Sequence, residues 1–483
     1  MQIVSTSPFA LIIFAAILWV GPLRGIPILF AAMPFYAAAA FNAPGLGSVS
    51  LGDIALIAMW LSFFLRTAAV PRALGMLRPG LPGFPLMMLM VVAGVGAIFL
   101  PRIFMGQTEV FAIGRANGHA AILLKPLAPS GANIGQFLRL LLVASAMPLL
   151  AAILARSGDT EIVMKAVIVA TVVHLVISAL DLISNGLGFP ELLEFIRTSN
   201  YEMLDNQRMM NIRRMIGGFP EPSAYAYYTS GLYGFWFALW FRDQTSRLRI
   251  AMVVLTGLAL LRSLSTAGMV NFVVFSGLFL VWHMRAAARE RKGITAYILL
   301  TMFVPFAVGV TVVIFNFVPA IPDFIDTLVF NKMDSSSGEE RMSWNVQAMQ
   351  NFRDSYGLGL GIGSVRASSW IMANLGNLGI AGIALQAWFL LSLLTMGRTL
   401  RSLDTKINEV TSALKACCVA ILLQALVLKT FPSLDLQFYA VSGMIAGLLI
   451  YQRRLYAGVK RADALVRYRH DGMTLGYASR VNA

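Results

Sequence analysis

The sequence predicts an all-α polytopic membrane protein with about 12 or 13 transmembrane helices and long loops on its outer side. Of its 483 residues, 58% are hydrophobic and 13% are charged, and the mean hydropathy is +0.73. This composition lies far outside that of soluble globular proteins. Apolar runs of near-spanning length recur along the chain, and the basic residues gather in short segments between them, as the positive-inside rule expects.

Thirteen apolar runs carry the helix prediction. Several of them, including the first two and the pair within 249–284, fall short of the ~20 residues of a usual span. The N-terminus has no basic region before its first run and no small-residue cleavage site, so we expect that run to be retained. The runs are residues 8–20, 26–41, 51–66, 84–100, 137–155, 164–184, 223–241, 249–262, 268–284, 294–318, 371–396, 411–430 and 435–452.

Lysine and arginine bias predicts the orientation. If the spans alternate, the basic clusters after residues 65, 241, 284, 397 and 452 fall on one side, which the positive-inside rule assigns to the cytoplasm. Residues 1–452 then form the transmembrane domain and 453–483 a basic cytoplasmic tail. Three longer segments are placed outside, namely residues 101–136, 185–222 and 319–370.

The outer segments differ in their predicted structure. Residues 101–136 are broken by glycine and proline and are expected to lie along the membrane surface. Residues 191–215 alternate apolar and charged side chains, which predicts a short amphipathic helix. A further helix is predicted over 339–352, with two acids in its favourable first turn. It precedes GLGLGIGS at 357–364, where a glycine backbone could approach a ligand closely.

Several classes of function are disfavoured. The net charge of +15 could suggest nucleic acid, but its distribution fits the positive-inside rule, so no nucleic-acid partner is expected. Cys417 and Cys418 are adjacent in an apolar run and only four histidines are present, so neither a disulfide framework nor a metal site is expected. No nucleotide-binding, metalloprotease or serine-hydrolase motif occurs. We therefore expect no cofactor.

The stretch Asn211–Ser230, NIRRMIGGFPEPSAYAYYTS, is the centre of the predicted site. Pro222 suits the first helical position, which places Glu221 at the cap. Arg213 and Arg214 could then converge with the free N–H groups of the helix start on an anion. The alternative is that both arginines snorkel at a membrane edge.

Further arginines lie on the outer side, where the charge rule disfavours them. Planar guanidinium groups suit phosphate and pyrophosphate. The alternative is pairing with neighbouring acids, which nearly balance the local charge. The outer arginines are Arg197, Arg208, Arg213 and Arg214 in one loop, Arg341, Arg353 and Arg366 in another, and Arg262 at a turn between two short helices; the neighbouring acids are Glu191, Glu194, Glu202, Asp205, Glu339, Glu340 and Asp354.

One acid lies within a predicted span. His174 and Asp181 are seven residues apart and share a helix face, with Asp181 near the outer end. An intramembrane acid is a candidate functional group. The alternative is a packing partner for a serine or threonine of a neighbouring helix. Glu221 is the preferred general base, and Asp181 and Glu340 are the substitutes.

Three stretches resemble the superfamily of O-antigen polymerases and O-antigen ligases, which includes exopolysaccharide polymerases. They are RRMIGGFPEPSAYA at 213–226, LLRSLSTAGMVNF at 260–272, and SGEERMSWNVQAMQNF at 337–352 followed by GLGLGIGS and NLGNLGIAG. The third is the most specific and the second the least. With the long outer loops and the number of spans, the likeness extends over most of the chain.

The resemblance implies a metal-independent, GT-C-like membrane glycosyltransferase that acts on undecaprenyl-pyrophosphate-linked glycans at the periplasmic face of the inner membrane. It implies that Arg341, and Arg213 or Arg214, engage the donor pyrophosphate, with a chain-length regulator and a flippase as partners. Ligases of the family usually carry a histidine after the glycine-rich stretch. This chain reads SVRASSW there, which favours the polymerase over the ligase. A transporter of the same glycans is the remaining alternative.

Overall fold

The computed structural model describes residues 2–43, 47–67, 70–116, 119–186, 189–200, 203, 207–209, 212–289, 336–398 and 404–481. These residues are mostly helical, and six of their helical segments are long and apolar enough to cross a membrane. The chain is thus a polytopic membrane protein built mainly from helices. The six segments are Gly83–Ile103, Gly131–Ser157, Thr160–Ser184, Thr266–His283, Trp370–Thr395 and Thr405–Leu428.

The first half of the bundle contains shorter helices together with three long ones. A three-stranded antiparallel sheet of β1 (Gln2–Ile3), β2 (Ala39–Ala43) and β3 (Gly47–Ser50) lies beside its first helices. The helices are α1 (Ser7–Val20), α2 (Ile26–Ala32), α3 (Leu51–Thr67), α4 (Val70–Gly75), α5 (Gly83–Ile103), α6 (Gly131–Ala144), α7 (Ala146–Ser157) and α8 (Thr160–Gly186).

The second half contains the central helix and the C-terminal helix. Two small hairpins lie between helices. The first, between α5 and α6, pairs β4 (Glu109–Ala116) with β5 (His119–Pro126), and the second, before the central helix, pairs β6 (Arg208–Met209) with β7 (Ile212–Arg213). The helices are η1 (Pro190–Ile196, 3₁₀), α9 (Pro222–Arg242), α10 (Arg247–Arg262), α11 (Thr266–Arg289), α14 (Ser336–Asp354), α15 (Trp370–Thr395), α16 (Thr405–Leu428) and α17 (Asp435–Val481).

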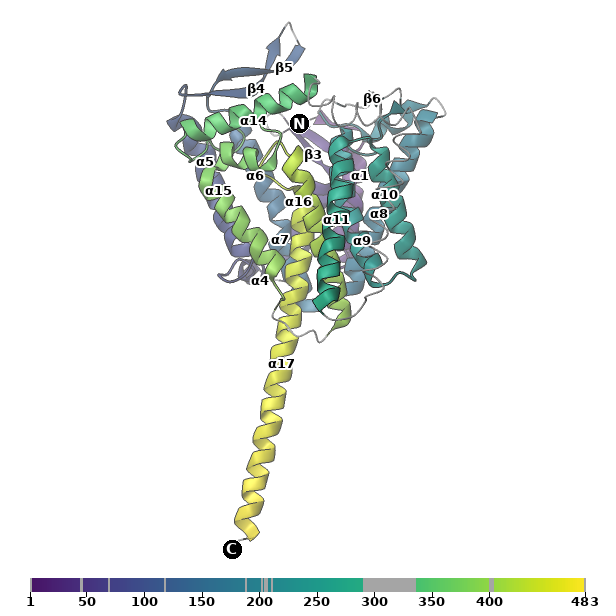
Figure 1. Ribbon diagram of the computed structural model, residues 1–483, viewed down its shortest axis with the longest axis vertical. Coiled ribbons are helices and arrows are strands. Elements are labelled where there is room, and N and C mark those ends of the chain that lie inside the picture. The colour runs from purple at the N-terminus through teal and green to yellow at the C-terminus, as the bar shows by residue number, and fades with distance from the viewer. Residues whose placement is uncertain are drawn as a thin grey trace.

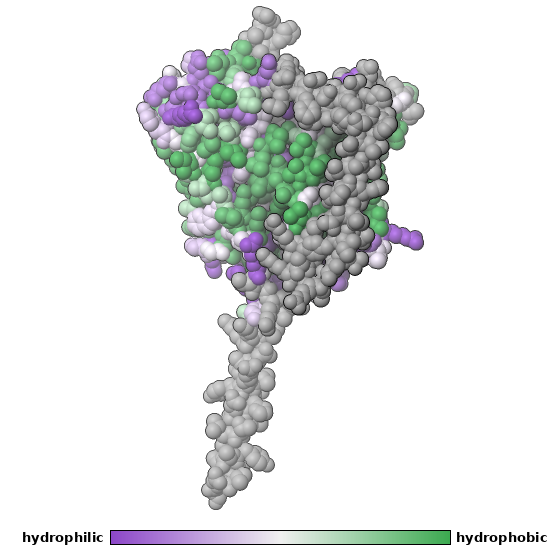
Figure 2. All heavy atoms as spheres, viewed as in Figure 1, coloured by the Kyte–Doolittle hydropathy of each residue, from purple (hydrophilic) through white to green (hydrophobic). Residues whose placement is uncertain are grey.

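The two ends of the bundle differ (Figure 1). Helix α14, the hairpin β4–β5 and strand β6 lie at one end, which we call the outer end, and α17 runs through the bundle and far beyond the opposite end. Figure 2 shows hydrophobic residues gathered in the middle of one face, with hydrophilic residues toward both ends. The described parts of the three predicted outer segments therefore share one end of the molecule.

Helix α9 forms the centre of the bundle, because nearly all of its residues are buried. It packs against α16, where small residues permit close approach. A Cβ atom at Gly234 would lie 2.7 Å from Ala420 Cβ and 2.9 Å from Ala416 O. Helices α7 and α17 pack in the same way, since a Cβ atom at Gly443 would lie 2.6 Å from Met147 O.

Most predicted helices are confirmed, but one apolar run differs from the prediction. Helix α2 ends at Ala32, and residues 39–43 form a strand, so the run 26–41 is not one span. The run 137–155 lies within the segment Gly131–Ser157, which is long enough to cross a membrane but has a break at Ser145 between α6 and α7. Pro148 explains this break, because it has no N–H to donate to the carbonyl four residues earlier.

The structure does not test the apolar run 294–318, because it lies outside the described residues. The total of 12 or 13 spans therefore remains a prediction. The predicted tail from residue 453 continues α17 as helix to Val481.

The three predicted outer segments differ in how their structure compares with the prediction. Residues 109–116 pair with residues 119–126 as a β-hairpin, which the sequence did not predict, and the position of 101–136 along the membrane surface stays a prediction. The short amphipathic helix predicted within 191–215 appears only as the 3₁₀ helix η1, which ends at Ile196. The N–H groups of Thr198 and Ser199 instead donate to Ala37 O, at 3.1 Å each. The helix predicted over 339–352 is confirmed, and it extends over Ser336–Asp354.

Candidate functional site

The glycine-rich stretch 357–364 packs against the protein's own helices, not against an open cavity. Gly357, Gly359, Gly361 and Gly363 all have positive φ angles, which glycine adopts without steric cost. A Cβ atom at Gly361 would lie 2.5 Å from Gly96 O, and one at Gly363 would lie 2.5 Å from Ala132 O. The close backbone approach expected from the sequence is therefore made to α5 and α6, so the stretch serves as a rigid support.

Helix α15 is kinked where this stretch meets it. Gly379 has a non-helical conformation, with φ 62° and ψ −158°. Leu360 N donates to Gly376 O at 2.8 Å, and Ile380 N donates to Gly357 O at 3.0 Å. These bonds replace helical ones lost at the kink. The glycine-rich stretch is thereby fixed to α15, immediately before the segment that carries Arg366.

Arg366 lies against Trp344 of α14. The guanidinium carbon is 4.4 Å from the centre of the indole ring, a cation–π contact. Ser368 N donates to Asn345 Oδ1 at 2.8 Å, which also joins this segment to α14. Arg341 and Glu340 lie on the same helix, so α14 brings two of the predicted site residues close to Arg366.

The arginines of the second outer segment are held by the hairpin β6–β7. Arg214 Nη1 donates to Gln207 Oε1 at 2.7 Å, and Arg214 N donates to Gln207 O at 3.0 Å. Arg262, the last residue of α10, donates from Nη1 to Arg213 O at 2.9 Å. This bond therefore joins two of the stretches that carry the resemblance, residues 260–272 and residues 213–226.

Glu221 lies at the start of α9, as the sequence predicted. Its backbone is extended, with φ −150° and ψ 157°, and Pro222 takes the first helical position. The carboxylate accepts a hydrogen bond from Ser223 Oγ. Glu221 is partly exposed, so a substrate hydroxyl at the outer end could reach it.

Electrostatics show that these segments converge. Burial and then the charge of Arg341 lower the pKa of Arg214 to about 10, and the charge of Glu221 opposes this shift. Burial also lowers the pKa of Arg366, whereas Glu340 and Glu221 raise it. Glu221 thus acts on the charges of both arginines, as groups at short separation do. Residues from three separate stretches thus form one cluster, which we call the arginine cluster: Arg214, Glu221, Glu340, Arg341 and Arg366.

The arginine cluster retains unused hydrogen-bond donors. Among the described residues, no acceptor is found for the buried atoms Arg214 Nε, Arg366 Nε and Trp344 Nε1. No ion pair joins Arg214, Arg341 or Arg366 to a carboxylate of the described chain. Buried donors usually have partners. The arrangement therefore suits an acceptor-rich anion such as a phosphate.

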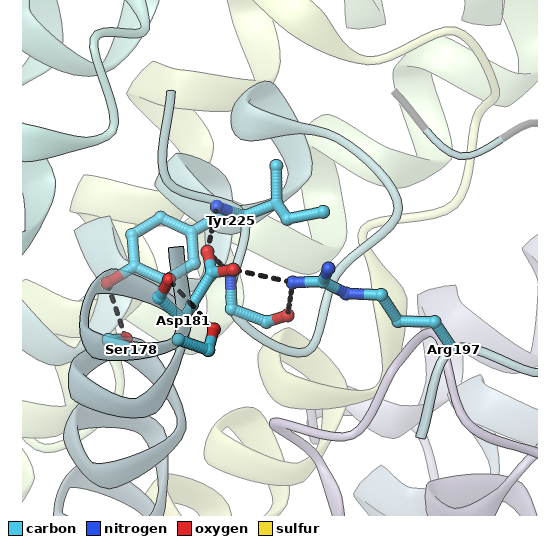
Figure 3. Close-up of polar contacts among 7 residues, drawn as sticks. Ser178, Asp181, Arg197 and Tyr225 are labelled. Carbon is cyan, nitrogen blue, oxygen red and sulfur yellow. Dashed lines mark hydrogen bonds and ion pairs between the residues drawn. The ribbon is translucent and has the colours of Figure 1, made fainter. Parts of the chain in front are cut away.

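Asp181 has a different environment (Figure 3). Its Oδ1 is 2.8 Å from Arg197 Nη2, and its Oδ2 accepts from Ile216 N and Gly217 N at 3.0 Å each. These contacts occupy the carboxylate inside the fold. Of the two explanations for the outer arginines, pairing with an acid therefore applies to Arg197.

His174 fits the alternative of packing against a neighbouring helix. Its Nε2 lies 2.8 Å from Thr229 Oγ1 of α9. The two remaining candidates, Arg208 in β6 and Arg353 near the end of α14, are exposed.

Sequence reasoning missed Trp344, Gln207 and the partner of Asp181. Trp344 sits three residues after Arg341, on the same face of a helix, so its place near the site was readable. The pairing of Asp181 with Arg197 was harder to predict, because the two residues lie on different elements and no local pattern joins them. Comparison with known proteins adds no relative: no protein-family model matches the chain, and no curated protein matches it significantly.

Proposed function

We propose that the chain is a membrane glycosyltransferase that polymerises undecaprenyl-pyrophosphate-linked oligosaccharide repeat units into a surface polysaccharide or exopolysaccharide. The observation that carries the proposal is the convergence of Arg214, Arg341 and Arg366 around Glu221 at the outer end. Arg214, Glu221 and Arg341 come from the stretches that carry the family resemblance, and Arg366 lies just after the glycine-rich stretch. The GT-C-like fold class, the inner-membrane location and the periplasmic site belong to the same proposal.

The chemistry fits the arginine cluster. A hydroxyl of the acceptor sugar attacks the anomeric carbon of the donor, the new glycosidic bond forms, and the bond from that carbon to the pyrophosphate oxygen breaks. Undecaprenyl pyrophosphate leaves with the bonding electron pair, so negative charge grows on it. Arginine donors aimed at that charge stabilise the transition state, and this needs no resident metal ion.

Glu221 supplies the general base in this proposal. Its carboxylate takes the proton of the attacking hydroxyl as the glycosidic bond forms. The electrostatic influence of Glu221 on both Arg214 and Arg366 supports a position between the groups that would hold the donor. Glu340, which influences Arg366, is the substitute base, whereas the carboxylate of Asp181 is engaged within the fold.

The test is elongation by the purified chain. In proteoliposomes given only lipid-linked repeat units, we expect glycans of several repeat lengths to form, with one undecaprenyl pyrophosphate released for each bond made. Elongation without a lipid acceptor supports the polymerase. Transfer that requires a lipid or protein acceptor would indicate a ligase, and transbilayer movement of the substrate without elongation would indicate a transporter.

A further inference from the structure

A buried acid ties three segments of the chain together. Asp181 is near the end of α8, Arg197 follows η1, and Ile216 and Gly217 lie in the turn before α9. Arg197 Nη2 donates both to Asp181 Oδ1, at 2.8 Å, and to Gly217 O, at 3.0 Å. The side chains of Arg197 and Asp181 are only 5% and 3% exposed. The two side chains of this ion pair thus bond to two N–H groups and one carbonyl oxygen of the turn (Figure 3).

The turn itself permits little freedom. Gly217 has a φ of 52°, and a Cβ atom on Gly218 would lie 2.3 Å from Pro34 O. Ala37 N donates to Gly218 O at 2.8 Å. The turn is therefore held from α8 on one side and from the segment after α2 on the other.

Deeper in the bundle, the same face of α8 is bonded to α9. Trp236 Nε1 donates to Thr171 Oγ1 at 2.8 Å, His174 Nε2 lies 2.8 Å from Thr229 Oγ1, and Ser178 Oγ lies 2.7 Å from Tyr225 OH. Residues 171, 174, 178 and 181 follow the spacing of one helical face. We call this series the polar ladder, and Asp181 is its outermost member.

The outermost member differs from the others because it bonds to backbone, not to a side chain of α9. Arg214 precedes the held turn by two residues, and Glu221 follows it by four. We propose that the Asp181–Arg197 pair is a positioning device that fixes this turn, so that Arg214 and Glu221 face one bound substrate. The assignment of substrate rests on the proposed function, whereas the fixing of the turn does not.

Burying an ion pair is a costly way to gain stability, because a well-packed apolar pair often serves as well. Here the two charged side chains also bond to the turn, because Asp181 accepts from two of its N–H groups and Arg197 donates to one of its carbonyl oxygens. An apolar pair could not make these bonds. Displacing a catalytic group by about 1 Å can cost on the order of 10² in rate. Asp181 and Arg197 thus act on the reaction through Arg214 and Glu221.

The test uses two measurements on the full chain in lipid nanodiscs. Hydrogen exchange over residues 212–220 reports whether the turn is held, and titration with farnesyl pyrophosphate reports binding by the arginine cluster. In Asp181→Asn, we expect faster exchange at Ile216 and Gly217 and roughly tenfold weaker binding or more. Unchanged exchange and affinity would overturn the proposal, and so would weaker binding with unchanged exchange, because Asp181 would then act on the ligand directly.

Two further variants separate positioning from folding. Thr171→Val removes a deeper bond of the polar ladder, and it should lower the unfolding temperature without changing exchange at the turn or affinity. Asp181→Asn with Arg197→Gln can keep all four hydrogen bonds without charge, so it should recover part of the affinity lost in Asp181→Asn alone. Failure of the double variant to improve on the single one, in a folded protein, would contradict the proposed geometry.

The proposed function can fail separately. Arg214→Gln should abolish farnesyl pyrophosphate binding while exchange at the turn stays slow. If the unmodified chain binds no farnesyl pyrophosphate, the pyrophosphate assignment is wrong, and the exchange data alone then decide whether the pair fixes the turn. If Asp181→Asn does not fold, Arg197→Lys provides the milder test, because it keeps the charge and can bridge the same two oxygens.

Discussion

The Asp181–Arg197 pair and the arginine cluster use the same kinds of side chain in opposite ways. At the pair, carboxylate and guanidinium are buried and bonded to each other and to the turn. In the arginine cluster, no carboxylate of the described residues forms an ion pair with Arg214 or Arg366. The buried Nε atoms of Arg197, Arg214 and Arg366 all lack an acceptor among those residues, so this feature does not separate them. A guanidinium that is paired with a buried carboxylate holds the fold, whereas one without such a partner can receive an anionic ligand. Ion pairing with a carboxylate therefore separates the structural arginine from the candidate binding arginines here.

The sharpest way to break this comparison is Glu221→Gln, which keeps size but removes the base. We expect turnover to fall by about 10² to 10⁴, while affinity for the lipid-linked donor stays close to that of the unmodified chain. Elongation rate and donor affinity are measured on the same preparation. Loss of thermal stability with unchanged turnover per folded molecule would make Glu221 a helix cap only.

Next in size are Arg341→Lys and Arg214→Lys. Each keeps its charge but loses the planar pair of donors, so each should lose most of the elongation activity in a folded, inserted protein. Arg213 is adjacent, so the variant with both Arg213 and Arg214 changed to lysine should also be measured. Arg353→Lys is the matched control, because Arg353 is exposed on the same helix as Arg341. Equal activity in all of these variants would leave the arginines without a binding role.

The pH dependence of binding gives a further test. Burial and Arg341 lower the pKa of Arg214 to about 10, so Arg214 is charged below that pH and loses its proton above it. Up to about pH 9 the charge of Arg214 does not change, so it should not alter the affinity for farnesyl pyrophosphate. Above that pH the affinity should fall. Titrations between pH 8 and 11 check this, and Arg214→Gln should lack the fall.

The smallest expected effects compare two buried tryptophans. Trp370 Nε1 donates to Pro432 O at 2.9 Å, whereas Trp344 Nε1 has no acceptor among the described residues. Trp370→Phe should lower the free energy of unfolding by about 1 kcal/mol or more for the lost bond. Trp344→Phe should cost less stability and should weaken donor binding a few-fold. The reverse order would mean that the unpartnered indole N–H has no ligand to bind.

The sequence singled out residues that the fold brings together, whereas it predicted the local structure around them less well. Arg214, Glu221 and Arg341 were selected because arginines were placed on a disfavoured side and because Glu-Pro marks a helix start. Both signals are local, and the start of α9 is as predicted. The hairpin β4–β5 and the loss of the helix beyond Ile196 depend on pairing with segments distant in sequence, so local patterns could not give them.

The glycine-rich stretch shows the same limit from the other direction. Its conformational freedom was read correctly, since four of its glycines have positive φ angles. The expected partner was a ligand, but the backbone lies against α5, α6 and α15. The glycine content predicts that another group lies close to this backbone, but only the fold shows which group it is.

The kink at Gly379 has a consequence for the order in which the protein is assembled. A straight helix entering the bilayer satisfies all of its own interior backbone bonds, whereas the kinked α15 leaves groups at Gly376 and Ile380 that are satisfied by residues 357–360. Unsatisfied backbone groups are costly in hydrocarbon. We therefore expect α15 to insert as a continuous helix and to bend only when the preceding stretch docks, so that bending is a late step of biogenesis.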